Sequence, residues 1–599
     1  MKKYLYPLSL MVFFFVNAYG QLIHKYSNAD ITAQEIQHHI DFLASDNLKG
    51  RLSGSKEIYK AAVYIKEEFE TYNLKPLFRN SYFQQYEFIT DVKLTKNNSL
   101  SFYFGNKKEK LEISKDYIPA TFSGNKSINA DLVFAGYGIS APKLKYDDYA
   151  NINVKGKVVI VMRGNPEYKN PRSEFSKYGG MRFKSNIAKE KGAGGIIFVD
   201  GYQPNLVNVD KLSKFRYDRA PGIRDFAIVQ VKRSFVEKLF ESQGVDFIKC
   251  DKIIKDSLKP ASFEFTNATA HITTEIEEVK GIDRNVAGYL KGNDDSLKNE
   301  YIVIGAHYDH LGMGIEGSLY KGTEPEIHHG ADDNASGTAG VMELAEKFAS
   351  VKDHLKRSII FVTFSGEELG LIGSDYFVNH LPIPANKIDA MINLDIIGRL
   401  RDKELTVYGT GTSSSWKDIL LNKNTYYFKI ASNEEGFGPS DHSSFYGKGI
   451  PVLFFFTGVH EDYHRPSDVA KLINGEGEDS VLNYVYDVAG FIDSMKVKAD
   501  YIKIASKGTT GDWKVYAGTV PDMSNTSEGF RLSGVSPGGP AEKAGLKGGD
   551  IMLKFGDREI NNIYDYVYAL QDHVPGDVVV VVVKRGNEKL SLTLTLGAK

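Results

Sequence analysis

The sequence has little cysteine and almost no excess charge. Its 599 residues include one cysteine, Cys250, so no disulfide can form within the chain and no cysteine-based metal site is possible. The formal net charge is -2, which gives no electrostatic basis for binding nucleic acid or an anionic membrane. Beyond the N-terminus, the chain lacks an apolar run of the roughly 20 residues that a membrane span needs. We therefore expect no nucleic-acid partner and no membrane span in the mature chain.

The first 20 residues are typical of a secretory signal peptide. "MKK" is a basic start, "YLYPLSLMVFFFV" an apolar core, and "NAYG" offers small residues before a cleavage site ahead of Gln21. The apolar run is short for a membrane anchor, which favours cleavage. No cysteine lies nearby to carry a lipid. We expect a periplasmic or secreted protein.

The length predicts several domains, because single hydrophobic cores rarely grow beyond about 250–300 residues. Apolar residues recur at three- and four-residue spacing from Ile58 to Phe69, which predicts a helix. From about residue 115, short strands and turns dominate, as in "ADLVFAGYGIS" and "GKVVIVMRG". From about residue 280, strands alternate with helices, which predicts a mostly parallel sheet. The segment after about residue 500 is again rich in strands.

Metal-binding residue types follow the ends of three predicted strands. His307 and Asp309 end "YIVIGAHYD", Glu367 and Glu368 end "IIFVTFSGEE", and Asp395 ends "MINLD". In open parallel sheets, ligands bind beyond the carboxyl ends of the strands, so these side chains should converge. The turn "HHGADDNASG" adds carboxylates, and "EDYHRPSD" adds a histidine. This convergence argues against a surface salt-bridge role for the two adjacent glutamates.

These five motifs, in the order in which they occur along the chain, resemble those of the co-catalytic di-zinc aminopeptidases. Their superfamily also contains glutamate carboxypeptidases, glutaminyl cyclases and the transferrin receptor. The resemblance covers roughly residues 30–115 and 280–495, and the five motifs together are far more specific than any one. It implies two Zn²⁺ ions. The implied ligands are His307 and Asp395 for one ion, Glu368 and His464 for the other, and Asp333 as the bridge between them.

The resemblance also implies that Glu367 is the general base. Two zinc ions carry four positive charges, of which the three ligand carboxylates balance three, and a bridging hydroxide would neutralise the remainder. Metal binding lowers the pKa of water, and Glu367 can accept its proton as it attacks a peptide carbonyl. Glu367 can then pass that proton to the leaving amine. The adjacent glutamates would thus have separate tasks, since Glu368 is a ligand and Glu367 a base.

Supporting roles follow for neighbouring residues. Asp309 is expected to orient His307 by accepting its other ring proton. Tyr463 matches a position that stabilises the oxyanion in related aminopeptidases, although a packed core tyrosine is an equal alternative. In the family the peptide bond after the bridging aspartate is cis, which predicts a cis bond after Asp333. The imidazole and carboxylate donors suit zinc, though manganese or cobalt could occupy the site.

Other polar residues near the motifs have less defined roles. His310, His328 and His329 are expected to support the site or face solvent rather than bind metal. Asp332 is expected to hold its turn, and the segment of Ser440, Asp441 and His442 is expected to form a wall of the site. Arg399 could meet a substrate carboxylate or pair with a structural acid, and the sequence leaves this open.

Two flanking segments resemble known accessory domains. Residues 116–275, with "VKGKVVIVMRG" and "NIAKEKGAGGIIFVDG", resemble a protease-associated domain, which would roof the active site or act as a spacer. Residues 503–599, with "GVSPGGPAEKAGLKGGDIMLKFGDREI", resemble a PDZ domain. There Pro540 should begin a short helix, and Gly548 to Asp550 should form the turn before a strand. "YAGTVPD" departs from the usual carboxylate-binding loop, so a peptide C-terminus and an intramolecular ligand both remain open.

The predicted fold is α/β: a mostly parallel-sheet zinc exopeptidase core with an inserted β-rich protease-associated domain and a C-terminal PDZ domain. The expected boundaries are 1–20 for the signal peptide, 21–115 and 276–500 for the peptidase, 116–275 for the insertion and 503–599 for the PDZ domain. The expected function is removal of N-terminal residues from peptide substrates. A carboxypeptidase or dipeptidase on the same scaffold, or a non-enzymatic peptide-binding protein, are the alternatives. A glutaminyl cyclase is disfavoured because two full metal sites suit hydrolysis of a chain end.

Overall fold

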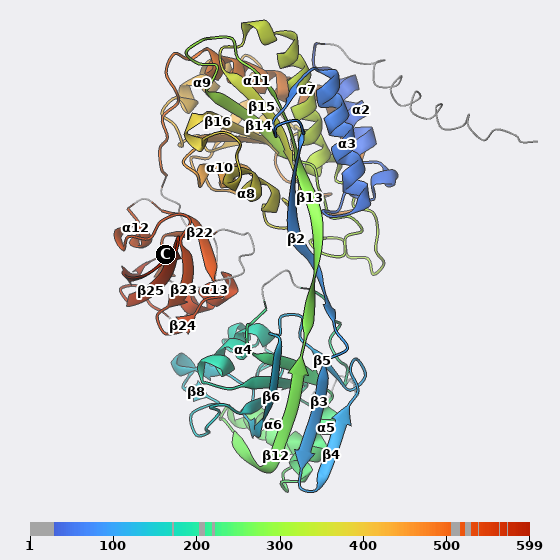
Figure 1. Cartoon of the computed structure of the whole chain (residues 1–599), viewed down its shortest axis with the longest axis vertical. Coiled ribbons are helices and arrows are strands. Elements are labelled where there is room, and N and C mark those ends of the chain that lie inside the picture. Colours follow the sequence, from blue (N-terminus) through green and yellow to red (C-terminus); the bar gives the residue numbers. More distant parts are fainter. Residues whose placement is uncertain are drawn as a thin grey trace, which may run out of the picture. The chain divides into compact units, whose positions relative to one another are not determined.

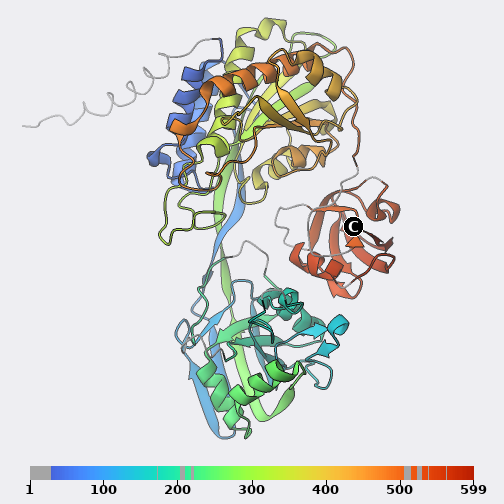
Figure 2. The same ribbon diagram turned by 180° about the vertical axis from the view of Figure 1, so that it is seen from behind.

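The computed structural model describes nine stretches of the chain. These are residues 29–170, 173–202, 210–217, 222–504, 515–521, 529–536, 538–561, 563–571 and 573–598. The predicted signal peptide lies outside the described residues. The chain divides into two compact units, residues 1–87 with 282–507 and residues 88–281 with 508–599, and each is described by itself (Figures 1 and 2).

The first unit is built on a nine-stranded sheet whose centre is parallel. Strands β14, β15, β16 and β19 run parallel, as predicted, while β13 and β17 pair antiparallel at either side. β2 pairs with β13 off the main path. The order is β1 (Lys75–Pro76), β13 (Ile276–Leu290), β15 (Ser358–Phe364), β14 (Tyr301–His307), β16 (Ile388–Leu394), β19 (Val452–Phe456), β17 (Glu404–Tyr408) and β18 (Lys429–Ser432), with β2 at Phe83–Leu94.

Two hydrophobic cores sandwich this sheet. In β14, Ile302 and Ile304 face a large core, whereas the intervening Val303 faces a smaller one, as the two-residue period of a strand requires. Because both faces are covered, the central strands read as continuous apolar runs. The larger core is packed by α2 (Ala33–Leu43), α3 (Lys56–Thr71), α7 (Gly337–Ser350) and α11 (Gly475–Ser494), and the smaller by α8 (Ile372–Asn379) and α10 (His442–Tyr446). The predicted 58–69 helix is α3. Among the described residues, no helix combines the length and apolar character needed to cross a membrane.

The inserted domain begins earlier in the chain than the sequence indicated. Strands β3 and β4, assigned above to the peptidase part at 21–115, belong to an eight-stranded sheet of the second unit. The reason is non-local pairing, because β3 lies antiparallel to β12, which is more than 150 residues further along the chain. The order is β4 (Lys107–Leu111), β3 (Ser99–Phe104), β12 (Phe263–Thr274), β6 (Lys126–Phe134), β9 (Val158–Met162), β10 (Gly195–Val199), β11 (Ala227–Val231) and β5 (Tyr117–Pro119). This sheet has its own core, packed by α4 (Met181–Glu190), α5 (Arg233–Glu241) and α6 (Phe247–Ser257).

The C-terminal domain has its own core and a small antiparallel sheet. Pro540 begins α12 (Pro540–Lys543), as predicted, because proline fits the first turn of a helix. Gly549 and Asp550 precede β23, also as predicted. The sheet comprises β21 (Thr519–Pro521), β22 (Phe530–Val535), β23 (Ile551–Phe555), β25 (Val578–Arg585) and β26 (Glu588–Thr595), with β24 (Arg558–Glu559) beside β23 and helix α13 (Ile563–Gln571) against it.

Within the second unit, the C-terminal domain contacts the inserted one through buried polar groups. Asn186 of α4 donates a hydrogen bond to the Asp565 carboxylate of α13, and both side chains are buried. Arg558 of β24 pairs with Glu190 at 3.2 Å, and its guanidinium lies 5.6 Å from the ring of Phe183. The C-terminal domain therefore has an intramolecular partner in the inserted domain.

Candidate metal centre

The register of the parallel strands aligns the segments that carry the candidate ligands. His307, the last residue of β14, lies opposite Phe364, the last residue of β15. Gly305 of β14 lies opposite Asn393 of β16, so Asp395 follows β16 at the same edge of the sheet. The glutamates of "SGEE" continue from β15 there. The convergence predicted from the strand ends is thus present in the structure.

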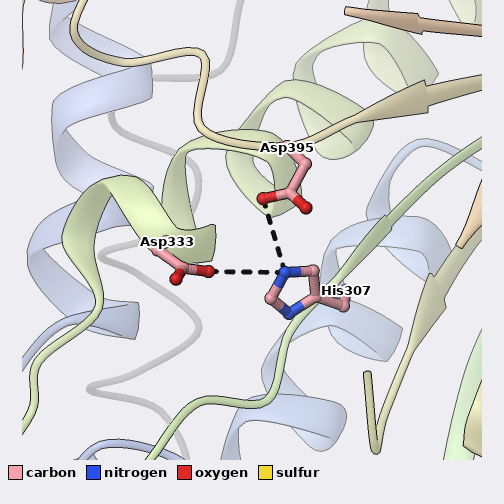
Figure 3. Close-up of side chains that lie close together, drawn as sticks. All are labelled: His307, Asp333 and Asp395. Carbon is pink, nitrogen blue, oxygen red and sulfur yellow. Dashed lines mark ion pairs between the residues drawn. The ribbon is translucent and has the colours of Figure 1, made fainter. Parts of the chain in front are cut away.

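One donor cluster consists of His307, Asp333 and Asp395 (Figure 3). Nε2 of His307 lies 3.4 Å from Oδ1 of Asp333 and 3.4 Å from Oδ1 of Asp395. All three residues are buried. Ser440 donates a hydrogen bond of 2.8 Å to the other oxygen of Asp395, so that carboxylate is held from behind.

A second donor cluster shares Asp333 with the first. Nε2 of His464 lies 3.2 Å from Oδ2 of Asp333 and 3.3 Å from Oε2 of Glu368. Asp333 therefore turns Oδ1 toward His307 and Oδ2 toward His464. This is the arrangement that a bridging carboxylate requires.

The two clusters fit zinc by spacing and by chemistry. Two atoms that each lie ~2.0–2.1 Å from one tetrahedral zinc ion are about 3.3 Å apart. The four donor spacings of the predicted ligands are 3.2–3.4 Å. Imidazole nitrogens and carboxylate oxygens are ligands that zinc accepts, and buried carboxylates need a compensating charge. The residues present can therefore hold a metal ion in each cluster.

The turn that carries Asp333 is fixed by buried hydrogen bonds. The peptide bond between Asp333 and Asn334 is cis, as predicted. Oδ2 of Asp468 accepts hydrogen bonds from the amides of Asp332 and Asp333, at 2.9 and 3.1 Å. Arg399 in turn pairs with Asp468 and with Asp462, each at 3.2 Å. The structure thus decides the open question about Arg399, which pairs with structural acids.

The charged donor residues shift one another's pKa values. Burial alone would raise the pKa of Asp333, but the neighbouring His310, His464 and His307 outweigh it and hold this pKa below its usual range. Burial would lower the pKa of His464, but its bond to Asp333 and the charge of Glu368 raise that pKa to about 9. The donors therefore stabilise opposite charges within one buried cluster.

Asp309 holds the main chain of both Glu367 and Glu368. Oδ1 of Asp309 accepts a hydrogen bond from the Glu367 amide at 3.1 Å, and Oδ2 accepts one from the Glu368 amide at 3.3 Å. The Glu367 carboxylate lies 3.9 Å from Nε2 of His307, and burial raises its pKa well above the usual range, assisted by the charge of Glu368. Nδ1 of His307 is nearer to the main-chain oxygen of Asp309 (3.2 Å) than to its carboxylate (3.6 Å). Asp309 therefore accepts hydrogen bonds from both glutamate amides, in addition to lying next to His307, which was its predicted role.

Tyr463 lies beside the second donor cluster. Its ring stacks on His464, with centroids 3.9 Å apart. Burial raises the pKa of its hydroxyl, and the charges of four nearby carboxylates, among them Asp333 and Glu368, raise it further. The hydroxyl therefore stays protonated near the site. Its role in holding an oxyanion stays a prediction.

The structure also places the other polar residues considered above. Asp332 holds its turn, as expected: its Oδ1 accepts a hydrogen bond of 3.0 Å from the Ser336 hydroxyl in the same turn and one of 2.6 Å from the Gly398 amide. His328 bonds Ser318 at 2.7 Å, and His329 pairs with Asp46 at 2.9 Å. His310 lies against Glu368 at 2.7 Å, and His310, Asp333 and Glu368 together form a group whose possible ligand atoms all lie within 4.8 Å of one another. The remaining two, Asp441 and His442, are buried at the start of α10.

Arg51 was not singled out from the sequence, although it is fully buried beneath the site. Its guanidinium donates to the main-chain oxygens of Tyr308 (2.8 Å), His329 (2.8 Å) and Gly330 (2.9 Å), and also to that of Leu43. It ties the segment after β14 to the turn before α7, and so holds two ligand-bearing segments together. The signal in the sequence was an arginine between two glycine-containing turns, "KGRLSG", followed by a helix. Ser440 and Asp468 were overlooked as supports because their partners are distant in sequence.

Comparison with known proteins gives two matches to protein-family models. Residues 285–489 match the model of "Peptidase family M28", and residues 521–596 match that of a "PDZ domain". Residues 285–489 are therefore similar to the M28 peptidases, and residues 521–596 are similar to PDZ domains.

Several curated proteins are similar to part of this chain. Aminopeptidase YwaD of Bacillus subtilis is 26% identical over 57% of this chain and 64% of its own length. Leucine aminopeptidase 2 of Trichophyton rubrum is 29% identical over 32% of this chain and 37% of its own length. The chain thus spans less than two thirds of these relatives. Among solved structures, a zinc aminopeptidase from Bacillus subtilis is similar at 21% identity, covering 80% of this chain and 99% of that one with a TM-score of 0.45.

Proposed function

We propose that the protein is an exported, zinc-dependent aminopeptidase that uses two zinc ions. The observation that carries this proposal is Asp333, whose two oxygens face two separate histidines within two buried clusters. His307 and Asp395 would hold one ion, Glu368 and His464 the other, and Asp333 both. When bound, such ions polarise a peptide carbonyl and lower the pKa of water.

The chain's own residues then complete the reaction. The Glu367 carboxylate, close to His307, accepts the proton of the attacking water as the new carbon–oxygen bond forms. The same carboxyl returns this proton to the amine as the carbon–nitrogen bond breaks, so Glu367 ends the cycle ionised. The hydroxyl of Tyr463 donates a hydrogen bond to the developing oxyanion. Asp309 keeps the two glutamates in their separate positions.

Removal from the N-terminal end is favoured over the carboxypeptidase alternative by two observations. The relatives of this chain include proteins named aminopeptidase YwaD and leucine aminopeptidase 2. A carboxypeptidase also needs a cation for the free carboxylate of its substrate. Arg399, the cation considered for that role, pairs with Asp462 and Asp468. A purely binding role is disfavoured because both donor clusters and the base are complete.

The accessory features complete the proposal. The first 20 residues direct export to the periplasm or the exterior, and the inserted domain is of the protease-associated type. The PDZ domain takes a peptide C-terminus or an intramolecular ligand. Its contact with α4 supports the second of these roles.

One short peptide tests the function directly, in its free and N-acetylated forms, with products followed by mass spectrometry. Stepwise loss from the free N-terminus, blocked by acetylation, is the expected result. Cleavage of both forms from the C-terminus would move the assignment to a carboxypeptidase. No cleavage of either form with zinc present would contradict the proposed activity.

A further inference from the structure

His310 contacts the second donor cluster without belonging to its predicted ligand set. Its Nδ1 lies 2.7 Å from Oε1 of Glu368 and 3.9 Å from Oδ2 of Asp333. The side chain is fully buried, and its ring meets that of His464 edge-on with centroids 5.8 Å apart. A histidine in this place either binds the metal ion or acts on the ligand beside it.

The spacing separates these two possibilities. The predicted ligand pairs of both clusters are 3.2–3.4 Å apart, the distance expected for atoms that share one ion. The separation of 2.7 Å between His310 and Glu368 is shorter and matches an N–H···O⁻ hydrogen bond. Direct donation to the carboxylate is therefore the better description.

The two oxygens of Glu368 then have different partners. Oε2 lies 3.3 Å from His464, on the side of the proposed ion, while Oε1 lies at His310. We propose that His310 is a positioning residue for the second metal site. Its Nδ1–H holds Oε1 of Glu368, so that Glu368 presents Oε2 alone to the ion. This inference rests on the two-zinc site proposed above.

The surroundings of His310 hold its ring in place. The His310 amide donates to the main-chain oxygen of Arg51 at 3.2 Å. Gly330, with a φ of +58°, lies so close that a Cβ there would be 2.5 Å from the imidazole ring. Within the described part of the chain, Nε2 of His310 has no hydrogen-bond partner, so the ring is positioned by its main chain and by packing against Gly330. A ring held this firmly can impose an orientation on a carboxylate.

A matched pair of variants tests the role. Leucine and asparagine have nearly the same shape, but only asparagine keeps an N–H donor near the position of Nδ1. The measurements are zinc content and zinc affinity, by competition with a chromophoric chelator. We expect His310→Leu to lower the affinity for one of the two zinc ions about 10–100-fold and to leave the affinity for the other unchanged. His310→Asn should stay within about threefold of the wild type, because a donor to Glu368 remains. His329→Ala, at a histidine that pairs with Asp46, is the control and should change the affinity for neither ion.

The outcomes are distinguishable. Equal losses in His310→Leu and His310→Asn would show that His310 binds the ion or only fills space, and would overturn the inference. Unchanged zinc affinity in His310→Leu would overturn it as well. If the wild-type protein binds no zinc, the proposed function fails first. Visible absorption of the Co²⁺-substituted proteins gives a second readout, since a change in how Glu368 coordinates should alter the spectrum of His310→Leu and leave that of His310→Asn close to the wild type.

Discussion

At the scale of single residues, the site is organised by carboxylates whose two oxygens face different partners. Asp333 divides its oxygens between His307 and His464. Asp309 divides its own between the amides of Glu367 and Glu368. Each carboxylate therefore fixes the distance between two functional groups as well as binding them. This explains how two adjacent glutamates can serve different purposes.

Replacing Glu367 by glutamine should separate metal binding from catalysis. We expect the Glu367→Gln protein to keep its full zinc content, because the five predicted ligands are intact. Its kcat should fall by about 10²–10⁴-fold, the usual contribution of a positioned acid or base. Steady-state kinetics and zinc analysis of the same preparation check both points. Glu461→Gln, at an exposed glutamate two residues before Tyr463, is the control. Loss of zinc along with activity would mean that Glu367 is a ligand.

Glu478 of α11 should make the folded protein less stable as the pH rises. Its carboxyl is fully buried, and within the described residues neither oxygen has a hydrogen-bond partner. Burial raises its pKa well above the usual range, and the charges of Asp332 and Glu343 raise it further. The folded state thus keeps the proton, whereas the unfolded chain loses it above a pH of about 4.3. Above that pH, ionisation favours the unfolded state by about 1.4 kcal/mol per unit, until the folded pKa is reached.

The variant Glu478→Gln should remove this pH dependence. Thermal unfolding at pH 5, 6.5 and 8 is the measurement. The gain in Tm over the wild type should grow with pH, because glutamine carries no proton to lose. Glu476→Gln, at an exposed position of the same helix, should show no such trend. A Tm difference that stays constant across the three pH values would contradict the assignment of a buried neutral carboxyl.

At the scale of elements, the close approach of α7 to the end of β16 sets the distance between Asp333 and Asp395. Gly337 begins α7, and a Cβ there would lie 2.5 Å from both the Leu394 carbonyl oxygen and Oδ1 of Asn334. A larger residue must push the helix and strand apart. Only glycine permits this packing.

We therefore expect Gly337→Ala to destabilise the peptidase unit by about 1–3 kcal/mol and to weaken zinc binding in the His307 cluster. Denaturant unfolding and zinc competition measure the two effects. Gly490→Ala in α11 is the matched control, since its Cβ would meet nothing within 4 Å. It should instead stabilise by about 0.5–1 kcal/mol, because alanine suits a helix interior better than glycine. Similar destabilisation by both changes would refute the close-approach argument.

The strands that carry the site residues could be predicted from the sequence, because each is marked by a local run of apolar residues. His307, Glu368 and Asp395 follow apolar runs that could only be buried strands, so their convergence follows from sheet topology. The support from Arg51 and Asp468 could not be predicted, because all but one of the main-chain groups that they bond lie more than 130 residues away. The same limit applies to the insertion, whose strands from residue 99 read locally like any other and are assigned only by pairing with β12.

At the scale of the whole molecule, the three domains do not share a hydrophobic core, so we expect each to be stabilised separately. Two buried clusters cover the two faces of the peptidase sheet, and the inserted sheet and the PDZ domain each have one large cluster of their own. The donor clusters lie in the peptidase unit alone, among residues 307–464. Ligands that bind only the folded state stabilise the domain that holds them. Zinc should therefore stabilise one domain and leave the others unchanged.

Calorimetry of the full chain with and without chelator tests this coupling. We expect removal of zinc to lower the transition of the peptidase domain by several degrees, since ions held at 100 times their Kd contribute about 2.7 kcal/mol each. The transitions of the inserted and PDZ domains should stay in place, because neither shares a core with the metal ligands. The control is Asp333→Asn, which removes the bridging carboxylate charge and should make the peptidase transition insensitive to chelator. A uniform shift of all transitions on chelation would show instead that the three domains unfold as one cooperative unit.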